Sequence, residues 1–301
     1  MKNIQSVSYT YCARQKALAA LCRQTGVFEK AVIGKSCGGR EIAVYRLGRG
    51  RSYRLLAAAF HGSEHLTAVV LMMLMEEIAQ ALCHDGAVNG ISIKEKLQDH
   101  GLLFVPCVNP DGCEISLCGS VAAGSWRGRI ERWCGKDCTH WNANLRGVDI
   151  NHNFNAGWRE LRQKECDAGI FGPGPTRFGG FAPESEPETK AITALCRTLP
   201  IDRAAALHSQ GEVIYPYYGD QTPACTRRMA EVFSQASGYQ IEEPVALAAG
   251  GGFKDWFIET FCRPGFTFEL GRGENPLPPE QAAAIYEKAK EMLLLFAFGV
   301  F

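Results

Sequence analysis

The chain has 301 residues, of which 46% are hydrophobic and 21% charged, and its 32 Lys and Arg residues balance 32 Asp and Glu residues. This composition excludes a disordered chain, and the lack of a regular glycine period excludes collagen. Zero net charge gives no reason to expect a nucleic-acid or membrane partner, and the length suits one soluble enzyme domain over residues 1–301.

Residues 40–47 and 53–60 are predicted strands, because both are rich in residues that favour strands and a glycine turn at residues 48–50 separates them. Residues 66–83 are a predicted helix with small and apolar residues nearly all round, so we expect it to be buried. Its longest apolar stretch, residues 66–75, is too short to span a bilayer. We therefore expect no membrane association.

The rest of the chain continues this alternation of strands and helices. Predicted strands cover residues 102–108, 203–207 and 266–270, and predicted helices cover residues 186–198 and 280–298. Buried apolar strands that alternate with helices indicate an α/β fold, with a mainly parallel sheet covered on both faces. In such a sheet the functional site lies at the carboxyl ends of the strands.

Three of the predicted strands end in residues that can bind a metal or move a proton, namely His61 with Glu64, His208, and Glu269. Catalytic zinc commonly takes two histidines and one carboxylate and leaves the fourth position to water. His61, Glu64 and His208 fit that ligand set, which leaves Glu269 as the base for the bound water. The alternatives are His65 as a competing ligand, a capping turn over residues 61–64, and a helix N-cap or a buried ion pair at Glu269.

Thirteen cysteines, an odd number, are scattered along the chain. Since Met1 is followed by polar residues, we expect no secretory signal, and a core of this size needs no disulfides. Most of the cysteines are therefore expected to be reduced side chains in a cytoplasmic protein. Cys134, Cys138 and His140 offer a second metal site as an alternative, but they fall short of four well-spaced ligands.

Six short segments, taken in chain order, form the most specific pattern in the sequence. They are IGKS at 33–36 with GREI at 39–42, HGSE at 61–64, NPDG at 109–112, NLRGVDINHNF at 144–154, HSQGE at 208–212 with YPY at 215–217, and GGFKDW at 251–256 with FTFE at 266–269. Together they resemble the zinc carboxypeptidases of the M14 group. The resemblance is closest to the bacterial γ-D-glutamyl-diamino-acid peptidase branch.

This resemblance implies a three-layer α/β/α fold with a mixed, mostly parallel central sheet. It implies one zinc ion per chain, held by His61, Glu64 and His208, with Glu269 as general base and acid. These are the residues that the strand ends indicate on chemical grounds. Asn151 would help to hold a substrate carboxylate, and the implied substrate is a small peptide with a γ-D-glutamyl-diamino acid bond, as in cell-wall fragments.

The sequence departs from the family where a substrate carboxylate is bound. The family's Asn-Arg pair here reads Asn151-His152. Arginine is always charged and binds a carboxylate with two donors, whereas neutral histidine offers a single donor. We expect a neighbouring arginine, with Arg146 as the candidate, to hold the carboxylate of the diamino acid. We also expect His152 to contribute to substrate binding.

Two further family positions differ. Asn142 stands where the family has the arginine that stabilises the oxyanion, although Arg129, Arg132 or Arg146 could reach in from the same loop. The substrate-contacting tyrosine of the family is replaced by Leu247. These losses leave two alternatives open: a zinc deacylase that cleaves N-acyl amino acids, and a zinc-containing protein that binds peptides without cleaving them. The presence of Glu269 favours an enzyme, because a protein that only binds needs no base beside the metal.

Overall fold

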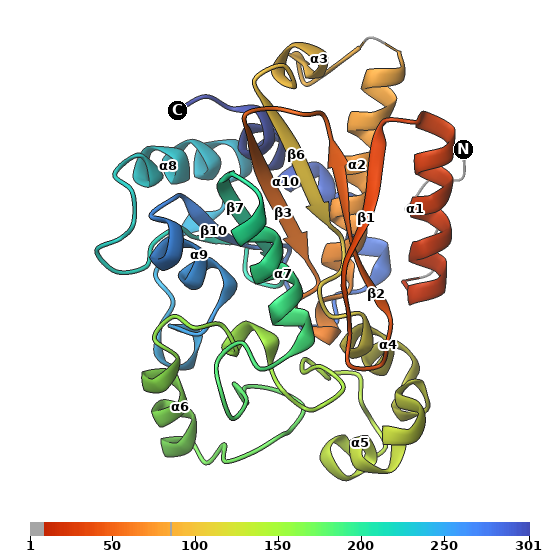
Figure 1. Cartoon of the computed structure of the whole chain (residues 1–301), viewed down its shortest axis with the longest axis vertical. Helices are drawn as coiled ribbons and strands as arrows, with labels where there is room; N and C mark the ends of the chain where they lie inside the picture. Colours follow the sequence, from red (N-terminus) through yellow and green to blue (C-terminus); the bar gives the residue numbers. More distant parts are fainter. Residues whose placement is uncertain (1–8, 85) are drawn as a thin grey trace.

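A mixed eight-stranded sheet forms the centre of the computed structural model, which describes residues 9–84 and 86–301 (Figure 1). Its strand order is β1-β2-β6-β3-β7-β10-β8-β9. The strands are β1 (Phe28–Lys35), β2 (Glu41–Leu47), β3 (Ser52–Ala58), β6 (His100–Val105), β7 (Ile201–His208), β8 (Val213–Tyr215), β9 (Gln240–Ile241) and β10 (Gly265–Glu269). The central strands β6, β3, β7 and β10 are parallel to one another, and β2 and β8 flank them in the antiparallel direction.

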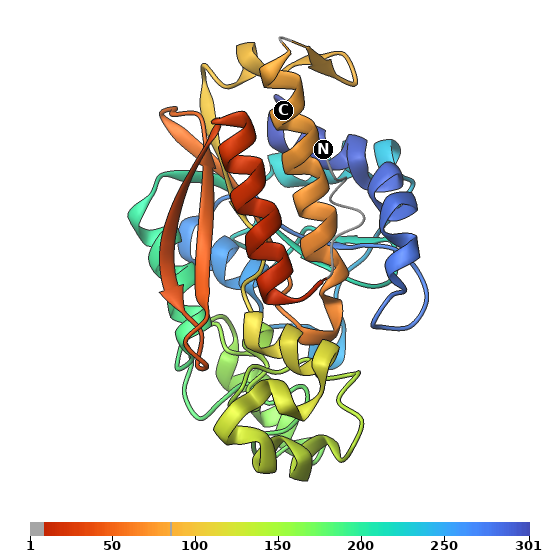
Figure 2. The ribbon, with the colours of Figure 1, turned by 90° about the vertical axis from the view of Figure 1, so that its right-hand side faces the viewer.

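Helices cover both faces of this sheet. One face packs against α1 (Tyr11–Thr25), α2 (Leu66–Cys83), α8 (Cys225–Ser237) and α10 (Ala282–Phe298), and Figure 2 shows α1 and α2 side by side there. The other face packs against α7 (Pro187–Thr198) and α9 (Phe253–Phe261). The three-layer α/β/α fold is thus confirmed.

Side chains that point alternately to the two faces of the central strands form two separate hydrophobic cores. In β3, Leu56 and Ala58 belong to the core under α2 and α10, whereas Leu55 and Ala57 belong to the core under α7 and α9. Successive side chains of a strand point to opposite faces, so a strand buried on both sides reads as a continuous apolar run. This is why the apolar runs of the sequence predicted the central strands correctly.

Helix α2 lies entirely within the predicted range and is buried, as its apolar pattern indicated. Among the described residues, one segment, residues 62–83, has the length and composition of a membrane-spanning helix, but most of it is buried inside the protein. It packs against α1, α10 and β3. The segment is therefore a core helix of this fold.

The remaining elements connect the layers. They are β4 (Ala87–Val88), β5 (Ile91–Ser92), α3 (Ile93–Lys96), α4 (Pro110–Cys118), α5 (Arg127–Cys134), α6 (Trp158–Asp167) and the short 3-10 helices η2 (Gly62–Glu64), η3 (Ser120–Trp126), η4 (Ile150–His152), η5 (Ala246–Ala248) and η6 (Pro279–Gln281). Helices α4, α5 and α6 gather beyond the carboxyl ends of the central strands (Figure 1). Strands β3, β7 and β10 end side by side at this edge, where Glu269 pairs in register with His208.

Candidate active site

The three predicted metal ligands meet at this edge of the sheet. Their ligand atoms, from His61, Glu64 and His208, all lie within 4.8 Å of one another. Glu64 lies between the histidines, with Oε1 2.8 Å from Nδ1 of His61 and Oε2 2.9 Å from Nδ1 of His208. Although burial opposes its ionisation, the two histidines lower the pKa of Glu64 to about 2. Two imidazole nitrogens and one ionised carboxylate therefore face a common point.

A tight turn after β3 brings His61 and Glu64 together. The intervening residues form η2, so a side chain three positions after His61 returns to the same side of the chain. Gly62 is required here, because a Cβ at this position would collide with the backbone oxygens of Trp141 and Gly112. Its N–H also donates to the carbonyl of Asn142 at 3.0 Å. Close packing against neighbouring backbone thus fixes the turn.

Asp149 orients the His61 ring from its other side. Nε2 of His61 lies 3.0 Å from Oδ1 of Asp149, and the same carboxylate accepts the backbone N–H groups of Asn151 and Arg177. Burial opposes the ionisation of Asp149, but His61 and His152 hold its pKa far below the usual range. An ionised Asp149 keeps the proton of His61 on Nε2, so Nδ1 presents a lone pair to the metal position.

This donor set fits zinc. Carboxylate–histidine–metal contacts of the kind made by Asp149 and His61 are usual in zinc proteins. His208 is buried, and its Nδ1 points to Glu64, while Nε2 has no hydrogen-bond partner among the described residues. Sequence reasoning assigned no role to Asp149, although it lies inside the GVDIN segment.

Glu269 lies beside the metal ligands, at the end of β10. Burial, and then the negative charge of Glu64, raise the pKa of Glu269 well above its ordinary value, with His61 acting in the opposite direction. A raised pKa favours a carboxyl group that can hold and return a proton. The position of Glu269 beside the three ligands is the one that the predicted base needs, and its role stays a prediction.

A cavity of about 130 Å³ adjoins the metal ligands and Glu269. Its lining residues come from several loops and strand ends: His61, Asn151, His152, His208, Tyr215, Pro244, Ala248, Gly252, Lys254, Asp255, Thr267 and Glu269. Asn151 is held in place because its Oδ1 accepts the N–H of Phe253 at 3.0 Å, which leaves its amide NH2 as the donor for a ligand. His152 is held by Glu165, with 2.8 Å between Nδ1 and Oε1.

The other two residues expected to bind substrate lie outside this lining. Arg146 is half-exposed and its guanidinium lies 3.6 Å from Glu186. Asn142 supports the metal-binding turn, since its side-chain oxygen accepts the hydroxyl of Ser63 and its carbonyl accepts the N–H of Gly62. Their contributions to substrate and oxyanion binding stay predictions.

An ion pair in the cavity was missed by sequence reasoning. Lys254 and Asp255 are only 5% and 2% exposed, and they contact each other at the start of α9. Nζ of Lys254 also donates to the carbonyl of Tyr217 at 2.6 Å, and Asp255 accepts the N–H of Gly250 at 3.0 Å. The available signal was a Lys-Asp dipeptide among the aromatic residues Phe253, Trp256 and Phe257, where charged residues need a partner or a function.

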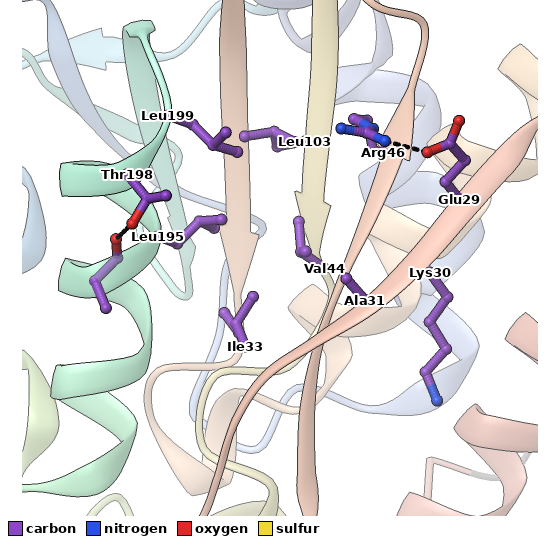
Figure 3. Close-up of a pocket in the computed structure, with 11 residues that line it drawn as sticks. Glu29, Lys30, Ala31, Ile33, Val44, Arg46, Leu103, Leu195, Thr198 and Leu199 are labelled. Atoms are coloured by element: carbon purple, nitrogen blue, oxygen red, sulfur yellow. Dashed lines mark hydrogen bonds and ion pairs between the residues drawn. The ribbon is translucent and has the colours of Figure 1, made fainter.

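A second, larger cavity, of about 370 Å³, is unrelated to this chemistry. It lies between α7 and strands β1, β2 and β6, and Figure 3 shows Ile33, Val44, Leu103 and Leu195 directed into it. Its charged rim includes Arg46 paired with Glu29. None of the candidate site residues lines it.

A group formed by Cys37, Glu186 and Glu188 also has metal-like spacing. Nδ2 of Asn144 donates to Glu186 at 2.8 Å and to Glu188 at 3.0 Å, and it lies 3.5 Å from the sulfur of Cys37. The Asn144 amide therefore fills the centre of the group, which is a hydrogen-bonded cluster.

The alternative metal site at Cys134 and Cys138 is a disulfide in the structure. The other eleven cysteines, all within the described residues, are free, in agreement with the expectation that most are reduced.

Comparison with known proteins identifies the family of this fold. The zinc carboxypeptidase family model matches residues 16–293. Gamma-D-glutamyl-L-diamino acid endopeptidase 1 from Lysinibacillus sphaericus is 32% identical over 290 residues, which cover 95% of this chain and 72% of that protein. The bovine thrombin-activatable fibrinolysis inhibitor has a similar structure, with a TM-score of 0.75 at 19% identity over 98% of this chain and 97% of that one. Murein-tripeptide amidase MpaA from Escherichia coli O157 has a TM-score of 0.55 at 20% identity, over 90% of this chain and 94% of that one. The chain belongs to the zinc carboxypeptidase family and is a zinc-dependent peptidase.

Proposed function

We propose that this peptidase hydrolyses the γ-D-glutamyl-diamino acid bond of small, cell-wall-derived peptides. The observation that carries the proposal is the Lys254–Asp255 ion pair, which lines the same cavity as the metal ligands and Glu269. The relative from Lysinibacillus sphaericus is named for γ-D-glutamyl-L-diamino acid bonds, and one structural neighbour is a murein-tripeptide amidase. Both names support the same class of substrate.

The chemistry of a diamino acid matches this ion pair. A diaminopimelate residue carries an ammonium and a carboxylate at the far end of its side chain. Lys254 supplies a cation for that carboxylate, and Asp255 supplies an anion for the ammonium. Because both residues are buried, their interactions with ligand charges are stronger than at an exposed surface. An apolar terminal residue would leave the pair without a ligand partner, and a purely basic one would pair with Asp255 but offer no carboxylate to Lys254.

Each of the site residues then has a defined task. His61, Glu64 and His208 would hold a zinc ion, which would supply a Lewis acid for the scissile carbonyl and the attacking water. Glu269 accepts a proton from the attacking water and delivers it to the leaving amine. Asn151 donates from its side-chain amide to a substrate carboxylate.

The test is a mass-spectrometric turnover assay with the zinc-loaded protein. L-Ala-γ-D-Glu-meso-diaminopimelate is compared with ordinary peptides that end in leucine or lysine and with N-acyl amino acids. We expect cleavage of the γ-D-glutamyl bond only, and its loss in Glu269→Gln. Cleavage of acyl amino acids instead would identify a deacylase. Binding of peptides with full zinc occupancy but no turnover would identify a binding protein.

We also propose the cytoplasm as the site of this activity. The eleven free cysteines support a reducing compartment. Cell fractionation with an antibody to the protein tests this, and recovery outside the cytoplasmic fraction would contradict it.

A further inference from the structure

Two thiols that have no role in the proposed reaction lie in contact near the N-terminus of α4. The sulfur of Cys107, in the loop after β6, is 3.8 Å from the sulfur of Cys113, in the first half of α4. Cys113 is fully buried and Cys107 is partly exposed. A disulfide has an S–S distance of about 2.05 Å, so the two sulfurs have to approach each other by roughly 1.8 Å to form a bond.

A buried arginine lies against one of the two sulfurs. Arg14 is only 2% exposed, and its two terminal nitrogens contact the carbonyl of Tyr9 and the sulfur of Cys107, the latter at 3.4 Å. A buried guanidinium is stabilised by neighbouring negative charge, which Glu114 and a thiolate at Cys107 can both supply. The hydrogen bond from Cys113 and, against the effect of burial, the charge of Arg14 lower the pKa of Cys107. Cys107 contacts Arg14 and lines a cavity, whereas Cys113 is fully buried, so the two sulfurs have distinct positions and roles.

A small cavity adjoins this pair. Its volume is about 20 Å³, it is lined by Cys107 and Arg14, and Tyr11, Pro106 and Pro110 contribute to its lining. This volume corresponds to little more than one water molecule. Hydrogen peroxide is small enough to approach Cys107 from this cavity.

We propose that Cys107 and Cys113 form a dithiol that is oxidised reversibly by small hydroperoxides. The Cys107 thiolate attacks one peroxide oxygen, the O–O bond breaks, and Cys107 becomes a sulfenic acid while hydroxide leaves. The sulfur of Cys113 then attacks the sulfenic sulfur, and the S–S bond forms as water leaves with the Cys113 proton. The two cysteines are oxidised, the peroxide is reduced to water, and a dithiol reductant reverses the change.

The experiment treats the full, zinc-loaded chain with hydrogen peroxide, alkylates the remaining thiols, and digests the protein with trypsin and with a protease that cuts before aspartate. Cleavage before Asp111 separates Cys107 from Cys113. We expect the two peptides to remain joined, with the mass of the pair lower by two hydrogens, and dithiothreitol to separate them. Joined peptides do not identify the second cysteine, because Cys118 lies in the same fragment as Cys113.

Matched variants resolve this point. Cys118→Ser should keep the link, as should Cys196→Ser, which removes another buried cysteine. Cys113→Ser should abolish the link and leave a sulfenic acid on Cys107 that dimedone captures. The proposal is overturned if wild-type Cys107 stays fully alkylatable after peroxide treatment, or if the link persists in Cys113→Ser. The wild-type measurement decides the first point even if a variant does not fold.

Discussion

Nε2 of His61 lies 3.0 Å from a carboxylate oxygen of Asp149, and its Nδ1 lies 2.8 Å from Glu64. The imidazole is thus held between two carboxylates that have different tasks. Glu64 and His61 both face the metal position. Asp149 instead accepts a hydrogen bond from Nε2–H of His61 and so determines which ring nitrogen carries the proton. Because Asp149 is itself held by two backbone N–H groups, the ring has one favoured orientation.

Replacement of Asp149 by asparagine should weaken zinc binding without removing a ligand. An amide can offer its NH2 to Nε2, which favours the tautomer with the proton on Nδ1, and supporting contacts of this kind are worth about 10–100-fold in metal affinity. We expect a loss of that size in Asp149→Asn, measured by competition with a chelating dye. Asp220→Asn, at an exposed position, is the control. Equal affinities in wild type and Asp149→Asn would contradict the assigned role.

Glu269→Gln should lower kcat by about 10²–10⁴-fold, the usual contribution of a general acid or base. Zinc content should stay the same, because Glu269 is not one of the three ligands. The measurement is steady-state turnover together with metal analysis of the same samples. Glu259→Gln, an exposed glutamate on α9, serves as the control. An unchanged kcat would exclude Glu269 as the proton carrier, and loss of zinc would assign it to metal binding instead.

The metal site could be predicted from the sequence because each of its ligands lies at or just after the end of a strand. His61 and Glu64 are three residues apart after one strand, and His208 ends another, so the rule for parallel sheets brings them together. Asp149 could not be found in this way. Its contact with His61 joins positions 88 residues apart and depends on how the loop over residues 144–154 folds back.

The edges of the fold were also harder to predict than its centre. Strand β1 was not predicted, because only Phe28 is buried in it and the next four residues, which include Glu29 and Lys30, are exposed. The cationic end of Arg146 lies beside Glu186, a partner that sequence spacing does not reveal. Lys254 could be recognised as unusual, but its position in the cavity depends on the packing of α9 against the sheet.

Glu188 should make the stability of the protein depend on pH. Burial raises its pKa to about 7 from an ordinary value of 4.5. Between these values the folded protein holds a proton that the unfolded chain has released, so stability falls as pH rises through this window and is constant above it. The shift corresponds to about 3 kcal/mol in the free energy of unfolding.

Urea unfolding at pH 5 and pH 8 measures this effect. We expect the decrease from pH 5 to pH 8 to be smaller in Glu188→Gln than in wild type, by up to about 3 kcal/mol. Any pH-independent cost of the substitution cancels in this comparison. Glu243→Gln, at an exposed position, should show the wild-type decrease. The same decrease in Glu188→Gln as in wild type would show that this carboxyl group is ionised throughout the range.

Lys254 should determine the preference for a diamino acid that carries a far carboxylate. In wild type, kcat/KM for the diaminopimelate peptide should exceed that for the same peptide with L-lysine, which lacks this carboxylate. A hydrogen bond to a charged group is worth about 1.5–3 kcal/mol, or roughly 10–100-fold in this ratio. In Lys254→Gln we expect the ratio to fall by that amount, mainly because KM rises for the diaminopimelate peptide. Lys290→Gln, a lysine of α10 paired with Glu77 outside the cavity, should keep the wild-type ratio. Since the ratio compares two substrates on one enzyme, a general loss of activity from the unpaired Asp255 cancels, and an unchanged ratio would remove Lys254 from substrate recognition.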